Sequence, residues 1–179
     1  MNTRDLVSLS EYLRTDYDPD VEYVDGHLGN IYENKPSSHG FLQVWIGSWF
    51  NQHQTWGLIS GCGIRTQVSP TRVRLPDVVV LRKTGKYPPV LVEPPFAIIE
   101  IVASTDTFRE VLEKGREYAA MGIPNIWLVD PDTNILQQWQ DNAWRLVEGT
   151  VFHATAPVFL DMAPLLEEVD RYRQKSGDE

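Results

Sequence analysis

The chain has 179 residues, 25 acidic and 16 basic side chains, and a formal net charge of −9, which argues against broad electrostatic attraction to nucleic acid. Its single cysteine, Cys62, excludes an internal disulfide and a cysteine-based zinc cluster. A hydrophobic content of 42% is ordinary for a globular protein, and we expect one domain over residues 1–179 with its core at about 20–165.

Neither a membrane span nor a signal peptide is expected. No apolar run approaches the roughly 20 residues that cross a bilayer. The N-terminus, M-N-T-R-D-L-V-S-L-S, lacks the apolar region of a signal peptide. We therefore expect a cytoplasmic protein that has no membrane partner.

The N-terminal part predicts a helix and a hairpin. The segment S-L-S-E has the spacing of a capping box and predicts a short helix near residues 8–14. The Asp25–Gly26 pair interrupts the alternating segment V-E-Y-V-D-G-H-L-G-N-I-Y and predicts a tight β-hairpin. On this pattern alone, Glu22 is either an exposed strand residue or an acid that faces a site.

A long core helix is predicted after Pro36. It starts near Ser37 and continues to about Gln54, and apolar residues recur along it at helical spacing. These residues are Phe41, Leu42, Trp45, Ile46, Trp49 and Phe50. His39 lies in the first turn, where a surface or capping role and a role in a site both remain open. The Gly-rich segment 57–70 follows and predicts one bulged strand or two short ones.

Two apolar runs each carry one carboxylate where a hydrophobic residue would pack better. Asp77 precedes V-V-V-L, and Glu100 interrupts F-A-I-I-E-I-V. Both runs are short and bounded by proline, so we interpret them as buried strands. Burying a carboxylate costs several kcal/mol unless a cation, a metal or hydrogen-bond donors compensate it. Two such acids on successive strands therefore indicate a shared site.

The next helix is predicted over about 107–121, capped by Thr105 or Asp106 and ended by Gly122. Its predicted buried side contains Phe108, Val111, Leu112, Gly115, Tyr118 and Ala119. Lys114 falls at the flank of this stripe, where its side chain either covers the edge of the core or reaches back to the carboxylates of the preceding strand. Farther along, I-W-L-V-D predicts a buried strand, I-L-Q-Q-W-Q and A-W-R-L-V-E a hairpin, and the C-terminal segment a closing helix.

An acid before one strand and another within the next can jointly hold a hard divalent cation. Mg²⁺ prefers oxygen ligands and keeps several waters, so one or two carboxylates and a substrate phosphate suffice. A nearby ammonium such as that of Lys114 could position the attacking water or stabilise negative charge. The chain contains no P-loop and no G-x-G-x-x-G, H-E-x-x-H or G-x-S-x-G motif. The acids could instead form structural ion pairs with Arg65, Arg74 or Lys114.

The ordered set P-D, E-I-V, a helical K and W-L-V-D-P resembles the Uma-two-type restriction endonucleases of the PD-(D/E)XK nuclease superfamily. The segments V-E-Y-V-D-G, S-S-H-G and E-K-G-R-E-Y-A-A-M-G-I-P-N-I-W-L-V-D-P are similar to the same family, so the similarity runs from about Val21 to Asp161. It implies an α/β fold with a restriction-endonuclease-like core, in which helices flank a mixed central β-sheet and an N-terminal hairpin and helix precede it. The order strand, strand, helix, strand after Arg72 agrees with this fold independently.

The resemblance also implies a set of site residues. The metal ligands would be the carboxylates of Asp77 and Glu100 and the backbone carbonyl of Ile101. Where the superfamily places its lysine, this chain has Val102, a departure that is typical of the Uma-like branch. The lysine of that branch comes from the next helix, and the matching position is Lys114.

Further residues are implied around these ligands. Glu22 would be a catalytic acid that assists through the metal or water, and His39 would lie near the site. We also expect His39, Arg65 and Arg74 to contact substrate. The stretch A-S-T-D where the family has S-P-S-T, and Glu110 where an Asp is common, could alter the loop over the site. Basic residues near Asp77 in the sequence form either a local DNA-binding patch or an ordinary solvated surface, and they are Arg65, Arg72, Arg74, Arg82, Lys83 and Lys86.

We therefore predict a Mg²⁺- or Mn²⁺-dependent endonuclease that hydrolyses DNA phosphodiester bonds. Because such nucleases commonly dimerise, the resemblance also predicts a homodimer. One alternative is an inactive nuclease-fold module that binds nucleic acid or protein without cutting. Another is a structural homo-oligomer whose buried acids only form ion pairs.

Overall fold

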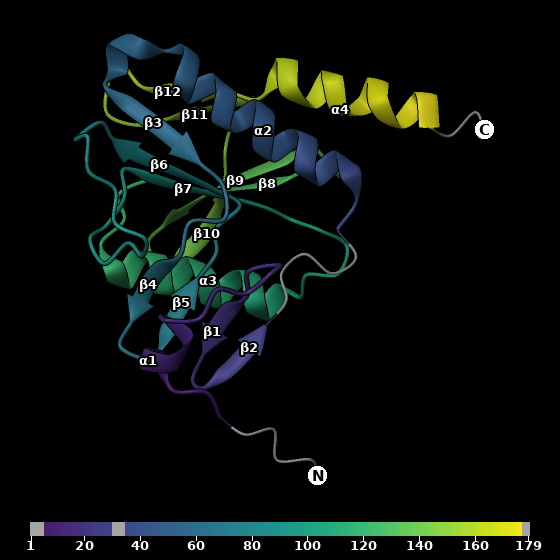
Figure 1. Cartoon of the computed structure of the whole chain (residues 1–179). Coiled ribbons are helices and arrows are strands. Elements are labelled where there is room, and N and C mark those ends of the chain that lie inside the picture. Colours follow the sequence, from purple (N-terminus) through teal and green to yellow (C-terminus); the bar gives the residue numbers. More distant parts are fainter. Residues whose placement is uncertain (1–5, 30–34, 177–179) are drawn as a thin grey trace.

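A six-stranded mixed sheet lies at the centre of the fold in the computed structural model, which describes residues 6–29 and 35–176 (Figure 1). Its strand order is β10-β9-β8-β7-β6-β3. The strands are β3 Leu58–Gly61, β6 Val78–Arg82, β7 Ala97–Ile101, β8 Ile126–Asp130, β9 Ile135–Gln140 and β10 Ala143–Leu146. The β7–β8 pair is parallel because α3 (Phe108–Met121) returns the chain between the two strands, whereas the other pairs are antiparallel. This arrangement confirms the predicted α/β fold.

A second, antiparallel sheet lies beside α3 and has the order β2-β1-β5-β4 (Figure 1). Its strands are β1 Glu22–Val24, β2 His27–Gly29, β4 Thr66–Ser69 and β5 Arg72–Arg74. The hairpin predicted at Asp25 and Gly26 is confirmed, and both residues adopt the positive φ values, 50° and 91°, that a tight hairpin turn needs. The predicted second strand continued to Tyr32, which lies outside the described residues.

Helices cover both faces of the central sheet (Figure 1). α2 and α4 pack on one face together with the two-stranded ribbon of β11 and β12, whereas α3 packs on the other face. The bounds are α1 Leu9–Tyr12, α2 Ser37–Gln52, the short 3-10 helix η1 Gln54–Trp56, β11 Val151–His153, β12 Phe159–Asp161 and α4 Ala163–Ser176. None of the described helices has the length and apolar character that crossing a membrane requires.

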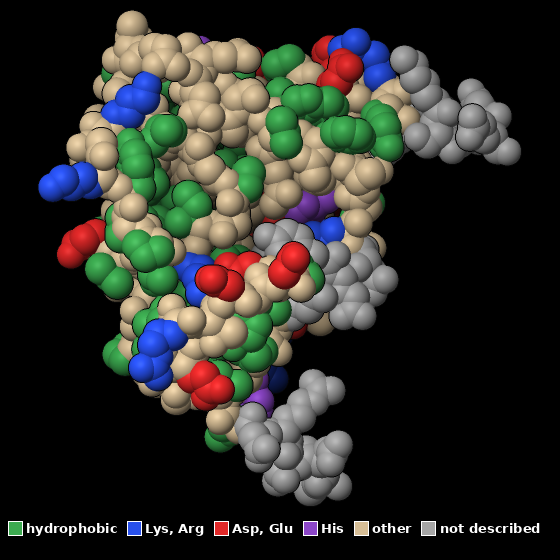
Figure 2. All heavy atoms as spheres, in the orientation of Figure 1, with side chains coloured by type: hydrophobic (Ala, Val, Ile, Leu, Met, Phe, Trp, Pro, Cys, Tyr) green, Lys and Arg blue, Asp and Glu red, His purple; other side chains and the backbone are tan. Residues whose placement is uncertain are grey.

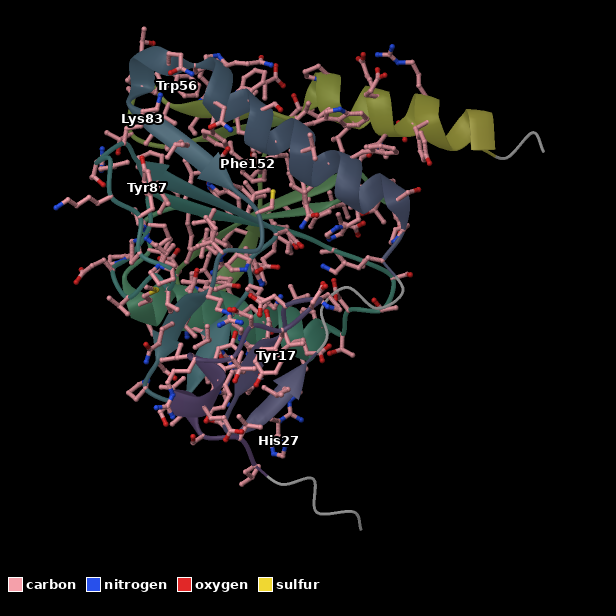
Figure 3. All side chains as sticks on the ribbon, in the orientation of Figure 1. Tyr17, His27, Trp56, Lys83, Tyr87 and Phe152 are labelled. Atoms are coloured by element: carbon pink, nitrogen blue, oxygen red, sulfur yellow. The ribbon has the colours of Figure 1, made fainter. Side chains whose placement is uncertain are left out.

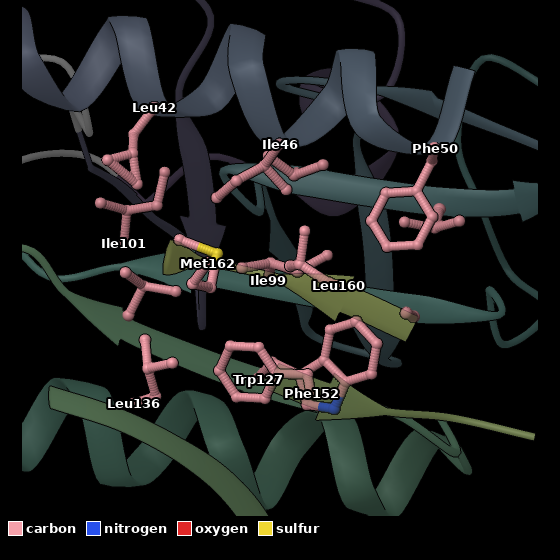
Figure 4. Packing of buried hydrophobic residues seen from close by; sticks show 14 of the residues in the cluster. Leu42, Ile46, Phe50, Ile99, Ile101, Trp127, Leu136, Phe152, Leu160 and Met162 are labelled. Atoms are coloured by element: carbon pink, nitrogen blue, oxygen red, sulfur yellow. The ribbon is translucent and has the colours of Figure 1, made fainter. Parts of the chain in front are cut away.

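α2 is the predicted core helix. Leu42, Ile46 and Phe50 are fully buried against the central sheet (Figure 4), and burial of each such side chain stabilises the fold by about 1.5–3 kcal/mol. The predicted apolar face is wrong at one edge, since Phe41 is 41% exposed. His39 lies three residues before Leu42, on the same side of the helix, and it therefore points inward with the core residues.

The start of α3 differs from the prediction. Thr107 and Glu110 form a reciprocal capping box, so the predicted caps Thr105 and Asp106 are wrong. Phe108, which was expected on the buried side, is 79% exposed. The reason is that residues 108–110 are all exposed, residues 111–114 are half-buried, and full burial in this helix is limited to Gly115 and Tyr118.

The middle of α3 lies unusually close to the central sheet. A Cβ atom on Gly115 would lie 2.5 Å from the ring of Trp139 and 3.0 Å from that of Trp144, so only glycine permits this approach. Gly122 ends the helix with φ 90°, as predicted. Lys114, the residue before Gly115, lies next to this close approach.

Candidate functional site

The pairing of β6 with β7 brings the two predicted acids together. Asp77 immediately precedes β6, and Glu100 lies within β7. Val78 is paired with Ile99, so Asp77 and Glu100 occupy neighbouring positions at the same end of the two strands. Both residues are buried, with exposed fractions of 2% for Asp77 and 6% for Glu100. The expectation that two buried carboxylates share one region therefore agrees with the structure.

Asp77 is surrounded by hydrogen-bond donors. Its Oδ1 accepts from Lys35 Nζ over 3.1 Å and from Gln43 Nε2 over 3.0 Å. Its Oδ2 accepts from the backbone N–H of Ile101 over 2.8 Å and lies 3.2 Å from His39 Nε2. Burial opposes ionisation, but the hydrogen bond and charge of His39 and the charge of Lys35 outweigh it and hold the pKa of Asp77 well below its ordinary value.

Glu100 has fewer donors and more negative neighbours. Tyr118 donates its hydroxyl hydrogen to Oε1, and Lys114 Nζ donates to Oε2 over 3.2 Å. Burial raises the pKa of Glu100, the charge of Lys114 lowers it, and the negative charge of Asp77 raises it again, so that the net direction is upward. The carboxylates of Glu100 and Glu22 raise the pKa of Lys114 against the opposing effect of burial, which keeps its ammonium charged.

Glu22 faces this site and not solvent, which resolves the alternative that the sequence left open. Its Oε1 lies 3.4 Å from Lys114 Nζ and accepts from the backbone N–H of Leu75, and its Oε2 accepts from Arg74 Nη1 over 2.7 Å. Burial opposes ionisation, but Lys114 and Arg74 together lower the pKa of Glu22. Lys114 is thus held between the carboxylates of Glu22 and Glu100. Of its two predicted positions, the one that reaches back to the acid of the preceding strand is the one observed.

His39 is buried, with an exposed fraction of 3%, so a surface role for it is excluded. The N-cap position of α2 is Pro36 and not His39. The Nε2 atom of His39 lies 3.1 Å from the carbonyl oxygen of Ile101 and 3.0 Å from Lys35 Nζ. His39 therefore belongs to the group of side chains around Asp77.

The two arginines predicted to contact substrate are already bound by acidic side chains. Arg65 pairs with Asp20 over 2.7 Å and stacks on the ring of Tyr12, with 4.7 Å between its Cζ and the ring centroid. Arg74 is buried and pairs with Glu22 and with Glu117, the latter over 2.6 Å. This placement does not support a direct contact of either guanidinium with DNA.

The basic residues that cluster in the sequence differ in their surroundings. Arg72 is bound to Asp25 over 2.6 Å and to Glu113 over 2.7 Å. Lys83 lies at the end of β6 that is farther from Asp77, near Tyr87 on the following loop (Figure 3). On the face shown in Figure 2, the described Lys and Arg side chains lie apart from one another. On this face, the arrangement agrees with the second of the two alternatives, an ordinary solvated surface.

Three side chains of the site were not predicted to belong to it. Gln43 and His39 are four residues apart on α2, and Tyr118 and Lys114 are four residues apart on α3, so each pair shares a helix face. That spacing is the signal that could have identified Gln43 and Tyr118. Lys35 precedes its helix and had no comparable signal in the sequence.

The donor atoms fit a hard divalent cation that retains water. Within the described ranges, no group of three or more His, Cys, Asp and Glu side chains is arranged to hold a metal ion by itself. Mg²⁺ needs only one or two carboxylates because water and substrate phosphate complete its coordination. Asp77, Glu100 and the carbonyl of Ile101 provide such an oxygen-rich set.

Comparison with known proteins agrees with the fold. The chain is similar to a crystal structure described as a "putative nuclease belonging to DUF820" from Anabaena variabilis ATCC 29413, with a TM-score of 0.74 and 18% identity over 91% of this chain and 99% of that chain. A cryo-EM structure of a DrdV–DNA complex aligns with a TM-score of 0.38 and 16% identity, covering 71% of this chain and 11% of that one, which is too weak a similarity to support an argument. No curated protein matches the chain.

A family model provides the assignment. The model of Uma2, whose description reads "Putative restriction endonuclease", matches residues 9–166, and this range contains the acids, the lysine and the histidine described above. The match covers most of the 179 residues. The chain therefore belongs to the Uma2 family.

Proposed function

We propose that this protein is a divalent-cation-dependent endonuclease that hydrolyses phosphodiester bonds in DNA. The observation that carries the proposal is the buried pair Asp77 and Glu100 on adjacent strands, with Lys114 of α3 bound to Glu100. A pair of buried acids can hold a divalent cation, and that cation and the charged lysine would together attract a substrate that carries negative charge. Membership of the Uma2 family and the fold of the DUF820 structure support the same class of enzyme.

Asp77, Glu100 and the carbonyl of Ile101 would hold the cation. When bound, Mg²⁺ or Mn²⁺ would polarise the phosphoryl group and lower the pKa of a bound water. Lys114 would stabilise negative charge on the phosphate or orient the attacking water, since the neighbouring carboxylates keep its ammonium protonated. Glu22 would act by holding Lys114 in place from the opposite side.

One observation favours the alternative of a module that binds without cutting. Lys35 already supplies Asp77 with a positive charge 3.1 Å away, so the carboxylate is neutralised by the chain itself. A structural homo-oligomer, the other alternative, would rely on the same ion pairs. Both alternatives predict that removal of divalent cations changes neither the stability nor the chemistry of the protein.

The decisive experiment measures cleavage of plasmid and single-stranded DNA with Mg²⁺, with Mn²⁺ and with EDTA. We expect cation-dependent cutting by the wild type and none by Asp77→Ala. The matched control is Glu93→Ala, which removes an exposed acid from the loop before β7 and should cut like the wild type. Cutting by Asp77→Ala at the wild-type rate would contradict the assignment of Asp77, and the absence of cutting by the wild type would favour a binding module.

The homodimer remains a prediction. Light scattering of the purified protein across a range of concentrations tests it directly, with a dimer mass as the expected result. A monomer mass at every concentration would contradict it.

A further inference from the structure

α2 is a surface helix without a charged residue. Its 16 residues include no Asp, Glu, Lys or Arg, although these types make up 23% of the chain. By contrast, α3 and α4 each carry six of them within 14 residues. Charged and polar side chains normally cover the solvent face of a surface helix. The composition of α2 is therefore typical of a helix that is covered on more sides than the described part of this chain covers it.

The side of α2 that points away from the central sheet is apolar. Phe41 is 41% exposed and Val44 is 62% exposed, and their spacing of three residues places them on one side of the helix. The ring of Phe41 contacts Trp45 and, on α4, Tyr172, with ring centroids 5.8 and 4.8 Å apart. Figure 2 shows hydrophobic side chains gathered over α2 and the adjacent part of α4. Enrichment in aromatic residues and depletion of charged ones characterise the centre of a protein–protein interface.

Gly40 lies on the same side of α2, and nothing in the described chain requires a glycine there. It is exposed, and a Cβ atom on it would meet no atom of another segment within 4 Å. It also lacks the positive φ that favours glycine. A glycine inside a helix destabilises it relative to alanine, so its presence at this position needs another reason. The missing side chain would allow a second helix to pack closely against α2 at this position.

The rim of this face carries charges of both signs. A hollow of about 180 Å³ lies between α2 and α4. Its lining residues are Phe41, Trp45, Glu168, Arg171 and Tyr172. Along α4, the sequence places three acids at 167–170 before three bases at 171–175. This order is self-complementary, because two copies packed antiparallel about a two-fold axis would bring the acids of each opposite the bases of the other.

We propose that the exposed side of α2, together with the adjacent side of α4, is the interface through which two copies of this chain form a dimer. α2 of one protomer would pack against α2 of its partner, with Gly40 and Val44 of both copies near the two-fold axis. DNA fits this face less well, because α2 has no Lys or Arg for phosphate contacts. The inference specifies the surface of the predicted homodimer, and it goes beyond the proposed endonuclease because a protein that does not cut DNA could dimerise in the same way.

Sedimentation velocity in the absence of DNA and divalent cations tests this surface. The wild type should sediment as a dimer. Val44→Glu should raise the dimer dissociation constant about a hundredfold or more, because it places two like charges in an apolar contact. The matched control is Val92→Glu, which adds the same charge at a valine that is 61% exposed on the loop before β7 and should leave the dimer intact. Gly40→Ala should weaken the dimer about tenfold, although alanine favours the isolated helix.

An exchange of charges tests the packing of α2 on α2. Val44→Lys alone should be monomeric, as should Val44→Glu. An equal mixture of the two variants should restore a dimer, because opposite charges then meet near the axis. Recovery of the dimer would also show that both variants are folded. A mixture that stays monomeric would overturn the placement of Val44 at the axis.

The possible failures can be distinguished. Dimerisation of Val44→Glu like that of the wild type would overturn this surface and leave the predicted homodimer standing. A wild type that is monomeric at every concentration would overturn both, and weaker DNA binding by Val44→Glu would then identify the face as a contact to nucleic acid. Equal dissociation of Val92→Glu and Val44→Glu would also contradict the proposal. None of these measurements depends on DNA cleavage, so the cleavage assay recognises a failure of the proposed function separately.

Discussion

Asp77 and Glu100 each bury a carboxyl group, but their surroundings shift its pKa in opposite directions. Asp77 accepts hydrogen bonds from a backbone N–H, an amide and an ammonium, lies beside an imidazole, and has a lowered pKa. Glu100 accepts from one lysine and one tyrosine, faces the charges of Asp77 and Glu22, and has a raised pKa. Burial opposes ionisation of both, so the number of donors and the sign of the neighbouring charges decide the direction.

This difference separates two kinds of contribution to stability. Ionised Asp77 stabilises the fold because its donors interact more favourably with it than water does. Ionised Glu100 costs free energy in the absence of a cation, because its two donors do not compensate for burial and for the nearby carboxylates. In the proposed cation site, the donors of Asp77 would hold that carboxylate in place, and Glu100 would attract a positive charge.

The largest effect on stability is expected when the charges of Asp77 and Glu100 are removed one at a time. Asp77→Asn in the presence of EDTA should lower the free energy of unfolding by about 3 kcal/mol, because buried donors lose a charged acceptor and Lys35 loses its counter-charge. Glu100→Gln should change it by at most about 1 kcal/mol in either direction, because the weaker hydrogen bonds of the amide are offset by the removal of a buried charge and Glu22 still neutralises Lys114. Urea denaturation measures both values, and a larger loss for Glu100→Gln than for Asp77→Asn would refute the comparison.

The pH dependence of stability provides a second test. The pKa of Asp77 is lowered, so its stabilisation is present above its ordinary value of 3.8 and is lost as the pH falls through the folded-state value. The pKa of Glu100 is raised, so its contribution is present below 4.5 and is lost as the pH rises through the folded-state value. As the pH rises above 4.5, the metal-free wild type should therefore lose unfolding free energy relative to Glu100→Gln. Urea titrations at several pH values measure it, and a difference that moves in favour of the wild type would mean that the pKa of Glu100 is lowered.

The smallest expected effect concerns Tyr118. Its hydroxyl group donates to Glu100, which lowers the pKa of that carboxyl group, so Tyr118→Phe should raise this pKa further. Loss of about 1 kcal/mol would move the pH midpoint of cation binding upward by about 0.7 pH unit. Calorimetric titrations with Mn²⁺ at several pH values measure the midpoint. Tyr87→Phe, which alters an exposed tyrosine, is the matched control and should leave the midpoint unchanged.

The sequence predicted the half of the site that leaves a local signal. Carboxylates inside apolar runs identified Asp77 and Glu100, because an unpaired acid in a buried strand is costly. Helical spacing placed Lys114 at the edge of the buried side of its helix. The core of α2 and the hairpin at Asp25 followed equally from local periodicity and turn chemistry.

The remaining parts depend on contacts between residues that are distant in the chain. Tyr118 was interpreted as a core residue because an aromatic side chain at helical spacing usually is one, and nothing local reveals that its hydroxyl group meets Glu100. Arg65 and Arg74 looked available to DNA because Asp20 and Glu117, which bind them, lie more than forty residues away in the chain. Local sequence patterns show which charges are present, but only the folded chain shows which of them are already paired.

Gly115 provides a means of altering the proposed nuclease site without changing its polar groups. Because an added methyl group would collide with Trp139, Gly115→Ala should lift the middle of α3 and shift the adjacent Lys114 away from Glu100. The proposed ligands Asp77 and Glu100 would be unchanged, so we expect cation affinity to persist while the rate of DNA cleavage falls. Measured together, the cation affinity and the cleavage rate would show whether the contact of Gly115 with Trp139 sets the distance between Lys114 and Glu100. Substitutions at this one glycine could then be used to adjust that distance.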